Sequence, residues 1–413
     1  MLIVYYIFAV IILLVQFPIL LEGYRHFHYT RKKYRSKPSH YQPKAALICP
    51  CKGIDTTFNR NIQSLFRQEY PDYEIFFVVE SIDDPAHERL EQIIRQHEPA
   101  NGQHEIPDGT KAHLSVAGKA TTCAQKVHNL RSLCQELDEE FEVLVFVDSD
   151  ACLKPYFLSS MTHPLRRREV GASTGYRWYV PVKFSLSNFV LSAINASVAS
   201  SLGPHNWNCT WGGAMAIQRD TFLRIGILEI WQNSCTDDLP LTRAVKDAGL
   251  KVAFVPACFV ASYENMSWGE FFSFARRQFL ITRICMPRLW RLALLSWGHF
   301  VLAFWTGLVV TLWLANHHSV HAIFAGIMPA FLLAVFMAKA MIRQVMIQKI
   351  LPEDRLRLLP GALTDILLGP VVAVIALILL LASACSRTMV WRGIKYRLHD
   401  YNHTEITPLS SDI

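Results

Sequence analysis

The sequence predicts an α/β domain with a mostly parallel sheet, joined to transmembrane helices on its N-terminal and C-terminal sides. Short apolar runs alternate with segments of helical spacing through the middle of the chain, as strands and crossover helices do. Long apolar stretches lie on both sides of that region, and each has the length of a membrane span. The composition, with 51% apolar and 18% charged residues, also favours a membrane protein.

The N-terminal apolar stretch predicts an uncleaved membrane anchor over residues 1–23. Residues 2–22 are apolar apart from Gln16 until Glu22 is reached, and roughly 20 such residues cross a bilayer. A basic start and a small-residue cleavage site, typical of a signal peptide, are not visible. Residues 24–44 form a basic linker beginning "YRHFHYTRKKYRSK". The positive-inside rule then places residue 25 onward in the cytosol, and a solvated linker that touches anionic lipid fits the same residues.

Three more apolar stretches near the C-terminus predict further membrane segments within residues 286–390. They cover about 291–315, 321–342 and 361–384, and residues 391–413 follow as a tail. A full crossing by the last stretch would leave "RTMVWRGIKYRL" on the outside, against the positive-inside rule. Gly369-Pro370 could instead break this stretch into a re-entrant element, so the number of crossings stays open.

Residues 45–285 predict a cytosolic domain of alternating strands and helices. Leu90, Ile93 and Ile94 lie on one face of a predicted helix. The strands are expected at "AALICPC" (45–51), "YEIFFVVES" (73–81), "AHLSVAG" (112–118) and "FEVLVFVDSD" (141–150), and the helices at residues 58–70, 85–97 and 124–137. Ligands of such sheets bind beyond the carboxyl ends of the strands.

Carboxylates follow two of these strands at their carboxyl ends. In "VLVFVDSDACLKP", Asp148 and Asp150 come directly after a buried strand, and Asp83 and Asp84 follow "IFFVVESI". Side chains two residues apart in an extended segment point the same way, so Asp148 and Asp150 should repel each other unless a cation lies between them. A divalent cation with oxygen ligands, shared with a bound phosphate, would meet that need. The alternative is a solvated turn with a chance pair of acids.

A second acidic pair, Asp237 and Asp238, lies in "CTDDLPLTRAVKDAGLKVAFVP". Thr236 could cap a helix there, with the two acids in its first turn, where the helix dipole favours negative charge. The same carboxylates could instead provide a general base for an acceptor hydroxyl.

Other features restrict the function or leave it open. The net charge of +7 comes largely from the runs beside the apolar stretches, and no basic stripe with interleaved aromatic residues suggests nucleic acid as a partner. The ten cysteines are scattered without a CxxC pair, which does not match a zinc site. The stretch 182–202 fits either an interfacial helix at an acceptor entrance or a core helix of the domain.

Taken together, these motifs resemble the ceramide glucosyltransferase family of membrane enzymes, from about Pro50 to Arg397. The matching stretches are "CKGID", "EYPDYEIFFVVESIDDPA", "AGKATTCAQKVHNL", "VFVDSDACLKP", "TDDLPLTRAVKDAGLKVAFVP" and the tail "WRGIKYRL". The resemblance implies a nucleotide-sugar transferase domain of the GT-A-like type. Each motif is weak alone, whereas their order and spacing together are specific.

The resemblance also implies roles for individual residues. Asp83 would lie by the uracil or ribose of the donor, with Asp84 beside it, and Lys126 would contact the nucleotide or its phosphates. Asp148 and Asp150 would hold the nucleotide and a Mg²⁺ or Mn²⁺ ion on the diphosphate.

For the acceptor side, the resemblance implies that Asp238 is the catalytic base, as the second member of the pair with Asp237. The small-residue loop "TWGGAM", with Trp211, Gly212 and Gly213, would be where acceptor and sugar meet. Without the resemblance, those glycines are equally compatible with a tight turn.

One segment departs from the family pattern. The family carries a Gln- or Arg-x-x-Arg-Trp motif, whereas "FARRQFLITRICMP" places Gln278-Phe279 at the Arg-Trp positions and Ala275 at the first. Arg276 and Arg277 lie one or two residues away, and a guanidinium from either would suit a leaving diphosphate. An amphipathic interface helix that uses arginine beside the membrane is the alternative.

The expected activity is transfer of a sugar, foremost glucose from UDP-glucose, to the hydroxyl of a membrane lipid by metal-dependent inverting displacement. Ceramide leads as acceptor by resemblance, and sterols, hopanoids or diacylglycerol carry similar hydroxyls. The rival interpretations are a processive polysaccharide synthase, a polyprenyl-phosphate sugar transferase and a non-catalytic membrane scaffold with a decayed transferase fold.

Overall fold

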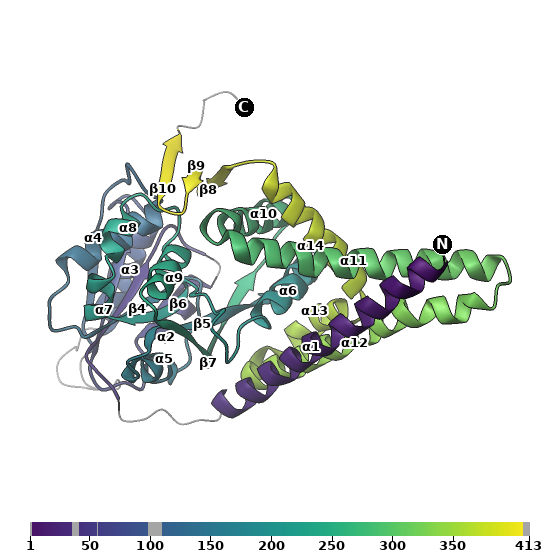
Figure 1. The fold of residues 1–413 in the computed structure, drawn as a ribbon. Helices are drawn as coiled ribbons and strands as arrows, with labels where there is room; N and C mark the ends of the chain where they lie inside the picture. The colour runs from purple at the N-terminus through teal and green to yellow at the C-terminus, as the bar shows by residue number, and fades with distance from the viewer. Residues whose placement is uncertain (1, 35–40, 56, 98–109, 408–413) are drawn as a thin grey trace.

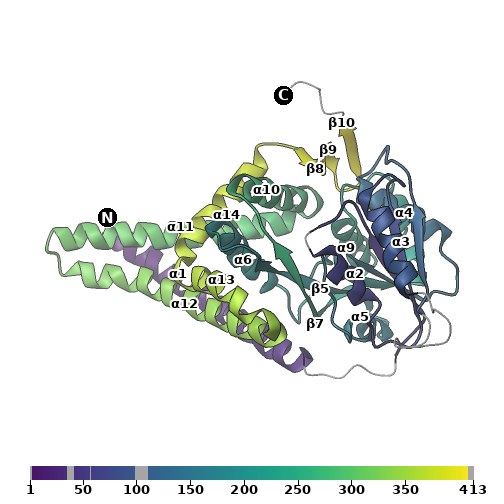
Figure 2. The same ribbon diagram turned by 180° about the vertical axis from the view of Figure 1, so that it is seen from behind.

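The computed structural model describes residues 2–34, 41–55, 57–97 and 110–407. A seven-stranded sheet forms the centre of an α/β domain, and long helices project together from one side of this domain (Figure 1). The reverse view shows the same division, with α6 and α13 lying between the sheet and the projecting helices (Figure 2). The predicted fold class is therefore confirmed.

The main sheet has the strand order β3-β2-β1-β4-β6-β5-β7. Four of its six pairings are parallel, and β6 pairs antiparallel with both β4 and β5. The strands are β1 (Ala45–Pro50), β2 (Tyr73–Val79), β3 (Ala112–Val116), β4 (Val143–Val147), β5 (Val170–Pro181), β6 (Ala214–Gln218) and β7 (Lys251–Glu264). The sheet is thus mostly parallel.

Helices cover both faces of this sheet because successive strand side chains point to opposite sides. In β1, Leu47 packs with the helices of one face and Ile48 with those of the other. The first face carries α2 (Phe58–Leu65), α3 (Pro85–His97) and α5 (Phe157–Thr162), and the second carries α4 (Gln125–Glu136), α8 (Ile227–Trp231) and α9 (Asp238–Asp247). Every residue of β1 and β4 is buried, as expected for strands covered on both faces.

The first four strands and three of these helices lie where the sequence predicts them, although α2 ends at Leu65 rather than near residue 70. The strands β5, β6 and β7 were not predicted. β5 and β7 run parallel to each other and lie at the edge of the sheet beside α6 (Leu186–Ala199). A short helix, α7 (Arg219–Arg224), and a 3-10 turn, His163–Arg166, complete this region.

The predicted interfacial stretch 182–202 contains α6. Ten of its fourteen residues are buried, including Asn188 and Asn195. The helix packs against β5 on one side and against α13 and α14 on the other. This placement favours the core-helix interpretation.

Three helices of the described chain are long and apolar enough to cross a membrane: α1 (Leu2–Tyr34), α11 (Pro287–Asn316) and α12 (His321–Ile350). The last predicted segment is broken. A 3-10 turn, Pro352–Asp354, leads into α13 (Arg355–Leu367), and α14 (Gly369–Ala384) follows at an angle of 87°. A Cβ at Gly369 would lie 2.0 Å from the Phe336 ring, so only glycine permits this close approach.

The helix α10 (Trp268–Cys285) connects β7 to these apolar helices and packs against α11 and α14. Its start is set locally, because Ser267 and Glu270 form a capping box. After α14 the chain returns to the α/β domain as a three-stranded sheet of β8 (Thr388–Trp391), β9 (Ile394–Asp400) and β10 (His403–Thr407). The residues predicted as a tail therefore carry β9 and β10.

Candidate active site

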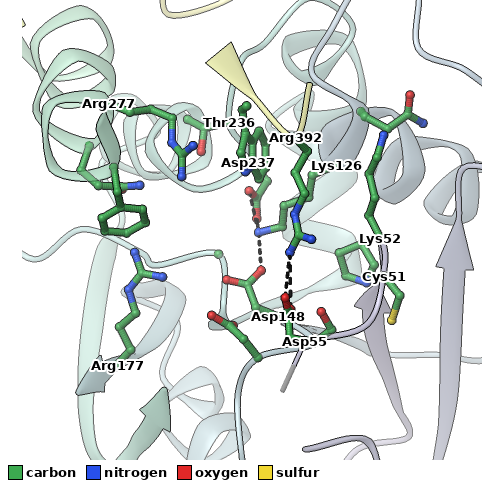
Figure 3. A pocket seen from close by; sticks show the side chains of 18 of the residues that line it. Cys51, Lys52, Asp55, Lys126, Asp148, Arg177, Thr236, Asp237, Arg277 and Arg392 are labelled. Atoms are coloured by element: carbon green, nitrogen blue, oxygen red, sulfur yellow. Dashed lines mark hydrogen bonds and ion pairs between the residues drawn. The ribbon is translucent and has the colours of Figure 1, made fainter. Parts of the chain in front are cut away.

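A cavity of about 620 Å³ lies at the carboxyl ends of β1 and β4 and the N-terminal ends of α4 and α9. Its polar lining carries both signs of charge, as Figure 3 shows. The acidic residues are Asp55, Asp148, Asp150, Asp237, Asp238 and Glu264, and the basic residues are Lys52, Lys126, Arg177, Arg277 and Arg392. Nine of the thirteen residues proposed from the sequence line it: Lys126, Asp148, Asp150, Trp211, Gly212, Asp237, Asp238, Arg277 and Gln278.

Lys126 supplies a cation to Asp148, the first of the two acids after β4. Its Nζ lies 2.8 Å from Asp148 Oδ1 and 3.0 Å from Asp237 Oδ1. Burial lowers the pKa of Lys126, but Asp148 and Asp237 outweigh it and hold that pKa above its usual value. A protonated lysine therefore joins the two acidic pairs that lie far apart in the sequence.

Asp148 and Asp150 do not lie in an extended strand. The strand β4 ends at Val147, and the Ala151 amide donates to the Asp148 carbonyl at 3.1 Å, closing a turn. The prediction that strand alternation orients the two side chains is thus wrong, although both line the cavity.

Among the described residues, Asp150 forms no ion pair within 4 Å, and its Oδ1 atom is buried without a hydrogen-bond partner. Burial, and then the charge of Asp148, raise the pKa of Asp150 to about 6. A buried carboxylate oxygen without a partner is unfavourable, and a cation bound beside it would remove the cost.

Asp237 and Asp238 have different surroundings. Asp237 is 2% exposed, and burial raises its pKa to about 6 against the opposing effect of Lys126. Asp238 is partly exposed and accepts hydrogen bonds from the Thr236 hydroxyl at 2.8 Å and the Leu239 amide at 2.7 Å. Thr236 therefore donates to Asp238 rather than capping α9, which begins at Asp238.

Gly212 and Gly213 allow this packing. The Gly212 amide donates to Asp238 Oδ2 at 3.2 Å, and a Cβ on Gly212 would lie 2.1 Å from Asp237 Oδ2. A Cβ on Gly213 would lie 2.6 Å from Asp148 Oδ2 and 2.2 Å from the Trp211 ring. The predicted acceptor loop thus packs directly against both acidic pairs.

The side chains of the arginine-rich segment on α10 point in two different directions. Arg277 and Gln278 line the cavity, whereas the Arg276 Nε atom donates to the carbonyl of Ala382 in α14 at 3.4 Å. Arg277 lies over the rings of Phe274 and Trp391, with its guanidinium carbon 5.2 and 5.5 Å from the ring centroids.

Asp83 and Asp84 do not line the cavity. Asp83 is exposed, and Asp84 Oδ1 accepts from the amides of Gly53 and Ala86 at 2.8 and 2.9 Å. These two hydrogen bonds hold the loop after β1 to the start of α3.

Five charged lining residues were not proposed from the sequence: Lys52, Asp55, Arg177, Glu264 and Arg392. Asp55 follows β1, and the rule applied to Asp148 would have identified it. Arg177 and Glu264 lie on β5 and at the end of β7, which the sequence did not predict. Arg392 lies in "WRGIKYRL", and no local pattern brings that segment to the cavity.

Chemically, the cavity combines hard oxygen ligands with guanidinium and ammonium groups. Across residues 2–34, 41–55, 57–97 and 110–407, no cluster of three or more His, Cys, Asp and Glu side chains is arranged to hold a metal ion. Two carboxylates with further ligands from an anionic substrate can hold Mg²⁺ or Mn²⁺. The lining therefore suits an anionic ligand that brings part of a metal's coordination shell.

Comparison with known proteins gives a family and two similar structures. Residues 8–403 match the model of glycosyl transferase family 21. The mannosyltransferase PcManGT from Pyrobaculum calidifontis, in complex with GDP-Man and Mn²⁺, is 14% identical with a TM-score of 0.46, over 92% of this chain and 97% of that one. GalNAc-T7 with UDP, GalNAc and Mn²⁺ is 12% identical with a TM-score of 0.41, over 58% of this chain and 51% of that one.

Proposed function

The chain belongs to glycosyl transferase family 21, and we propose that it transfers glucose from UDP-glucose to the hydroxyl of a membrane lipid such as ceramide. The observation that carries this proposal is the meeting of Lys126, Asp148 and Asp238 in one cavity beside the apolar helices. A charged donor and an apolar acceptor would thus reach the same space.

The lipid acceptor is supported by the apolar part of the cavity lining. Val182, Met266, Phe274 and Ile281 line this part. Phe274 and Ile281 lie on α10, which packs against α11 and α14. The lining is therefore continuous with helices apolar enough to lie in a membrane, and a lipid hydroxyl at the bilayer surface would enter from this side.

For the donor, we assign Lys126 and Asp148 to the nucleotide diphosphate. Lys126 is protonated and lies near the N-terminal end of α4, where the helix dipole favours an anion. Asp148 and Asp150 would hold Mg²⁺ or Mn²⁺, and the unpartnered Oδ1 of Asp150 fits a metal ligand. When bound, the metal would neutralise charge on the departing diphosphate.

For the acceptor, we assign Asp238 as the general base. Asp237 is almost wholly buried and paired with Lys126, whereas Asp238 is partly exposed on the cavity. Three donors, from Thr236, Leu239 and Gly212, orient the Asp238 carboxylate. It would accept the proton of the lipid hydroxyl as that oxygen attacks C1 of the sugar from the face opposite the leaving diphosphate. A single displacement of this kind inverts the anomeric carbon, so UDP-α-glucose would give a β-glucoside.

The charge beside α1 supports an orientation in the membrane. The last turn of α1 carries Arg31, Lys32 and Lys33, and basic residues beside a membrane span favour the cytosolic side. We therefore place the α/β domain in the cytosol, where nucleotide sugars are available to it.

The test is a reconstituted transfer reaction. Purified full-length protein in lipid nanodiscs would receive UDP-glucose, UDP-galactose, UDP-N-acetylglucosamine or GDP-mannose, each with ceramide, a sterol or diacylglycerol, and Mn²⁺. Mass spectrometry should detect glucosylceramide as the main product. Hexosylation of another lipid would correct the acceptor, a soluble or polymeric glycan would favour a polysaccharide synthase, and no sugar transfer with any pair would refute the proposal.

A further inference from the structure

The turn between β8 and β9 brings an arginine into the cavity from the C-terminal sheet. Trp391, Arg392, Ile394 and Tyr396 all line the cavity. Arg392 and Gly393 have φ values of 48° and 79°, the left-handed pair that a two-residue hairpin of type I′ requires. Glycine adopts this conformation freely, whereas arginine at the first position is uncommon. The turn therefore holds Arg392 in a conformation that its own backbone does not favour.

The sheet that carries this turn is anchored to the α/β domain. Met389, Tyr396 and Leu398 are buried in the same apolar cluster as Val127 of α4. The backbone amide of Gln125, the residue before Lys126, donates a hydrogen bond to the Tyr396 hydroxyl at 3.5 Å. The position of Arg392 is thus set by packing on the helix that also carries Lys126.

Among the residues that the structure describes, the charged partner of Arg392 is Asp55, and the contact is weak. The Nη2 atom of Arg392 lies 3.4 Å from both carboxylate oxygens of Asp55, as Figure 3 shows. The two side chains are 43% and 37% exposed, and exposed ion pairs of this length contribute little stability. Arg392 can therefore exchange Asp55 for a better anion at low cost.

The other cations of the cavity make an anion favourable at this position. Lys126 is engaged by Asp148 and Asp237, whereas Arg177 and Arg277 lie over aromatic rings. Burial, and then the charges of Arg177 and Arg392, lower the pKa of Arg277 to about 10. Three guanidinium groups around one cavity repel each other, and a phosphate group, which matches the guanidinium fork, relieves that repulsion.

We propose that Arg392 gives up its contact with Asp55 and binds the phosphate oxygens of the donor's diphosphate instead. The C-terminal sheet would thereby form one wall of the donor site. This inference rests on the proposed function, since it requires a nucleoside diphosphate in the cavity. It makes Asp55 the residue that Arg392 releases when it binds the diphosphate. It also gives "WRGIKYRL", which lies after the last apolar helix, a direct part in donor binding.

Calorimetric binding of UDP and of uridine to the purified full-length protein, with Mn²⁺ present, tests the role of Arg392. Arg392→Ala should weaken UDP binding by about tenfold or more, the cost of a lost charge-assisted hydrogen bond. Uridine has no phosphate, so its affinity should not change. Arg392→Lys keeps the charge but not the fork and should lose less affinity for UDP.

Arg397→Ala is the matched control, because Arg397 is exposed on β9, carries the same charge and does not line the cavity. It should bind UDP as the wild type does. Equal UDP affinity of the wild type and Arg392→Ala would overturn the role of Arg392 alone, and so would an equal loss for UDP and uridine. A wild-type protein that binds no UDP would instead refute the proposed donor.

Discussion

The ammonium group of Lys126 lies 2.8 Å from the carboxylate of Asp148 and thereby connects the end of β4 to the start of α4. The same Nζ atom lies 3.0 Å from Asp237. One cation thus stabilises an acid from each acidic pair, and the arrangement of the whole cavity depends on it.

Replacement of Lys126 by methionine should therefore destabilise the protein and abolish donor binding. Removing the partner of a buried charge costs about 3–5 kcal/mol, and the exposure of Asp148 should keep the effect near the lower limit. Thermal unfolding and UDP binding are the measurements. Lys119→Met removes an exposed lysine of the preceding segment that lies outside the cavity, and it should change neither. Normal UDP affinity in Lys126→Met would contradict its role.

Gly212→Ala should displace Asp237, because the new Cβ would lie 2.1 Å from Asp237 Oδ2. Overpacking of this kind costs about 1–3 kcal/mol, and we expect transfer activity to fall at least tenfold. Gly269 lies at the start of α10, where a Cβ would meet no atom within 4 Å. Gly269→Ala is therefore the control and should keep full activity, and equal activities for the two variants would show that the loop tolerates the extra carbon.

Asp150→Asn should make the affinity for UDP nearly independent of Mn²⁺. The wild type should bind UDP more tightly with Mn²⁺ than with EDTA, because two carboxylates and a diphosphate can share the ion. The asparagine variant should lose most of that difference while its affinity in EDTA stays similar. Titration calorimetry measures all four affinities. If EDTA leaves wild-type UDP affinity unchanged, Asp148 and Asp150 do not form a metal site.

Asp238→Asn should abolish transfer without weakening donor binding. The amide keeps the shape of the side chain but cannot accept the acceptor's proton, so the turnover number should fall at least about a hundredfold. Asp237→Asn serves for comparison. It removes a partner of Lys126 and should weaken UDP binding as well as turnover. A fully active Asp238→Asn enzyme would exclude this residue as the base.

Because of Glu264, we expect the stability of the folded protein to depend on pH. Burial, and then the charge of Asp150, raise the pKa of Glu264 to about 7, against the opposing charges of Arg177 and Arg392. An unfolded glutamate titrates near pH ~4.3, so the folded protein holds the extra proton between these values. The contribution of this group to stability therefore decreases as the pH rises through that window.

Glu264→Gln removes this titration. Relative to the wild type, the variant should be more stable by about 1–3 kcal/mol at pH 8 and equally stable near pH ~4.5. Thermal unfolding across this range measures the difference. A stability difference that does not depend on pH would mean that the pKa of Glu264 is the same in the folded and the unfolded protein.

Local patterns predicted much of the fold. The runs around Leu47 and Val145 are wholly apolar because both faces of these strands are covered, and such runs are visible without a structure. β5 was missed because it contains buried polar residues such as Ser173 and Thr174, whose burial depends on neighbouring elements. β7 is mostly apolar, but Pro256 within the run argues against a strand when only the sequence is considered. The antiparallel insertion of β6 leaves no local signal.

Local patterns in the sequence likewise predicted only part of the candidate site. Asp148 and Asp238 stand out because each lies at an element boundary where charge is unusual. Arg276 was proposed together with Arg277, although only Arg277 faces the cavity, because the rotation of α10 is set by its packing against α14. Asp84 was predicted beside the donor, but it does not line the cavity, and its Oδ1 accepts hydrogen bonds from Gly53 and Ala86.

The sequence by itself determined the first four strands of the main sheet, the stretches that suit a membrane and the acids that follow β2 and β4, because each of these depends on residues close together in the chain. Only the tertiary structure decided that Lys126 lies between Asp148 and Asp237 and that Arg392 faces Asp55. Those contacts join segments that strand order and helix packing bring together, and charge attraction acts on distance in space rather than on separation along the chain.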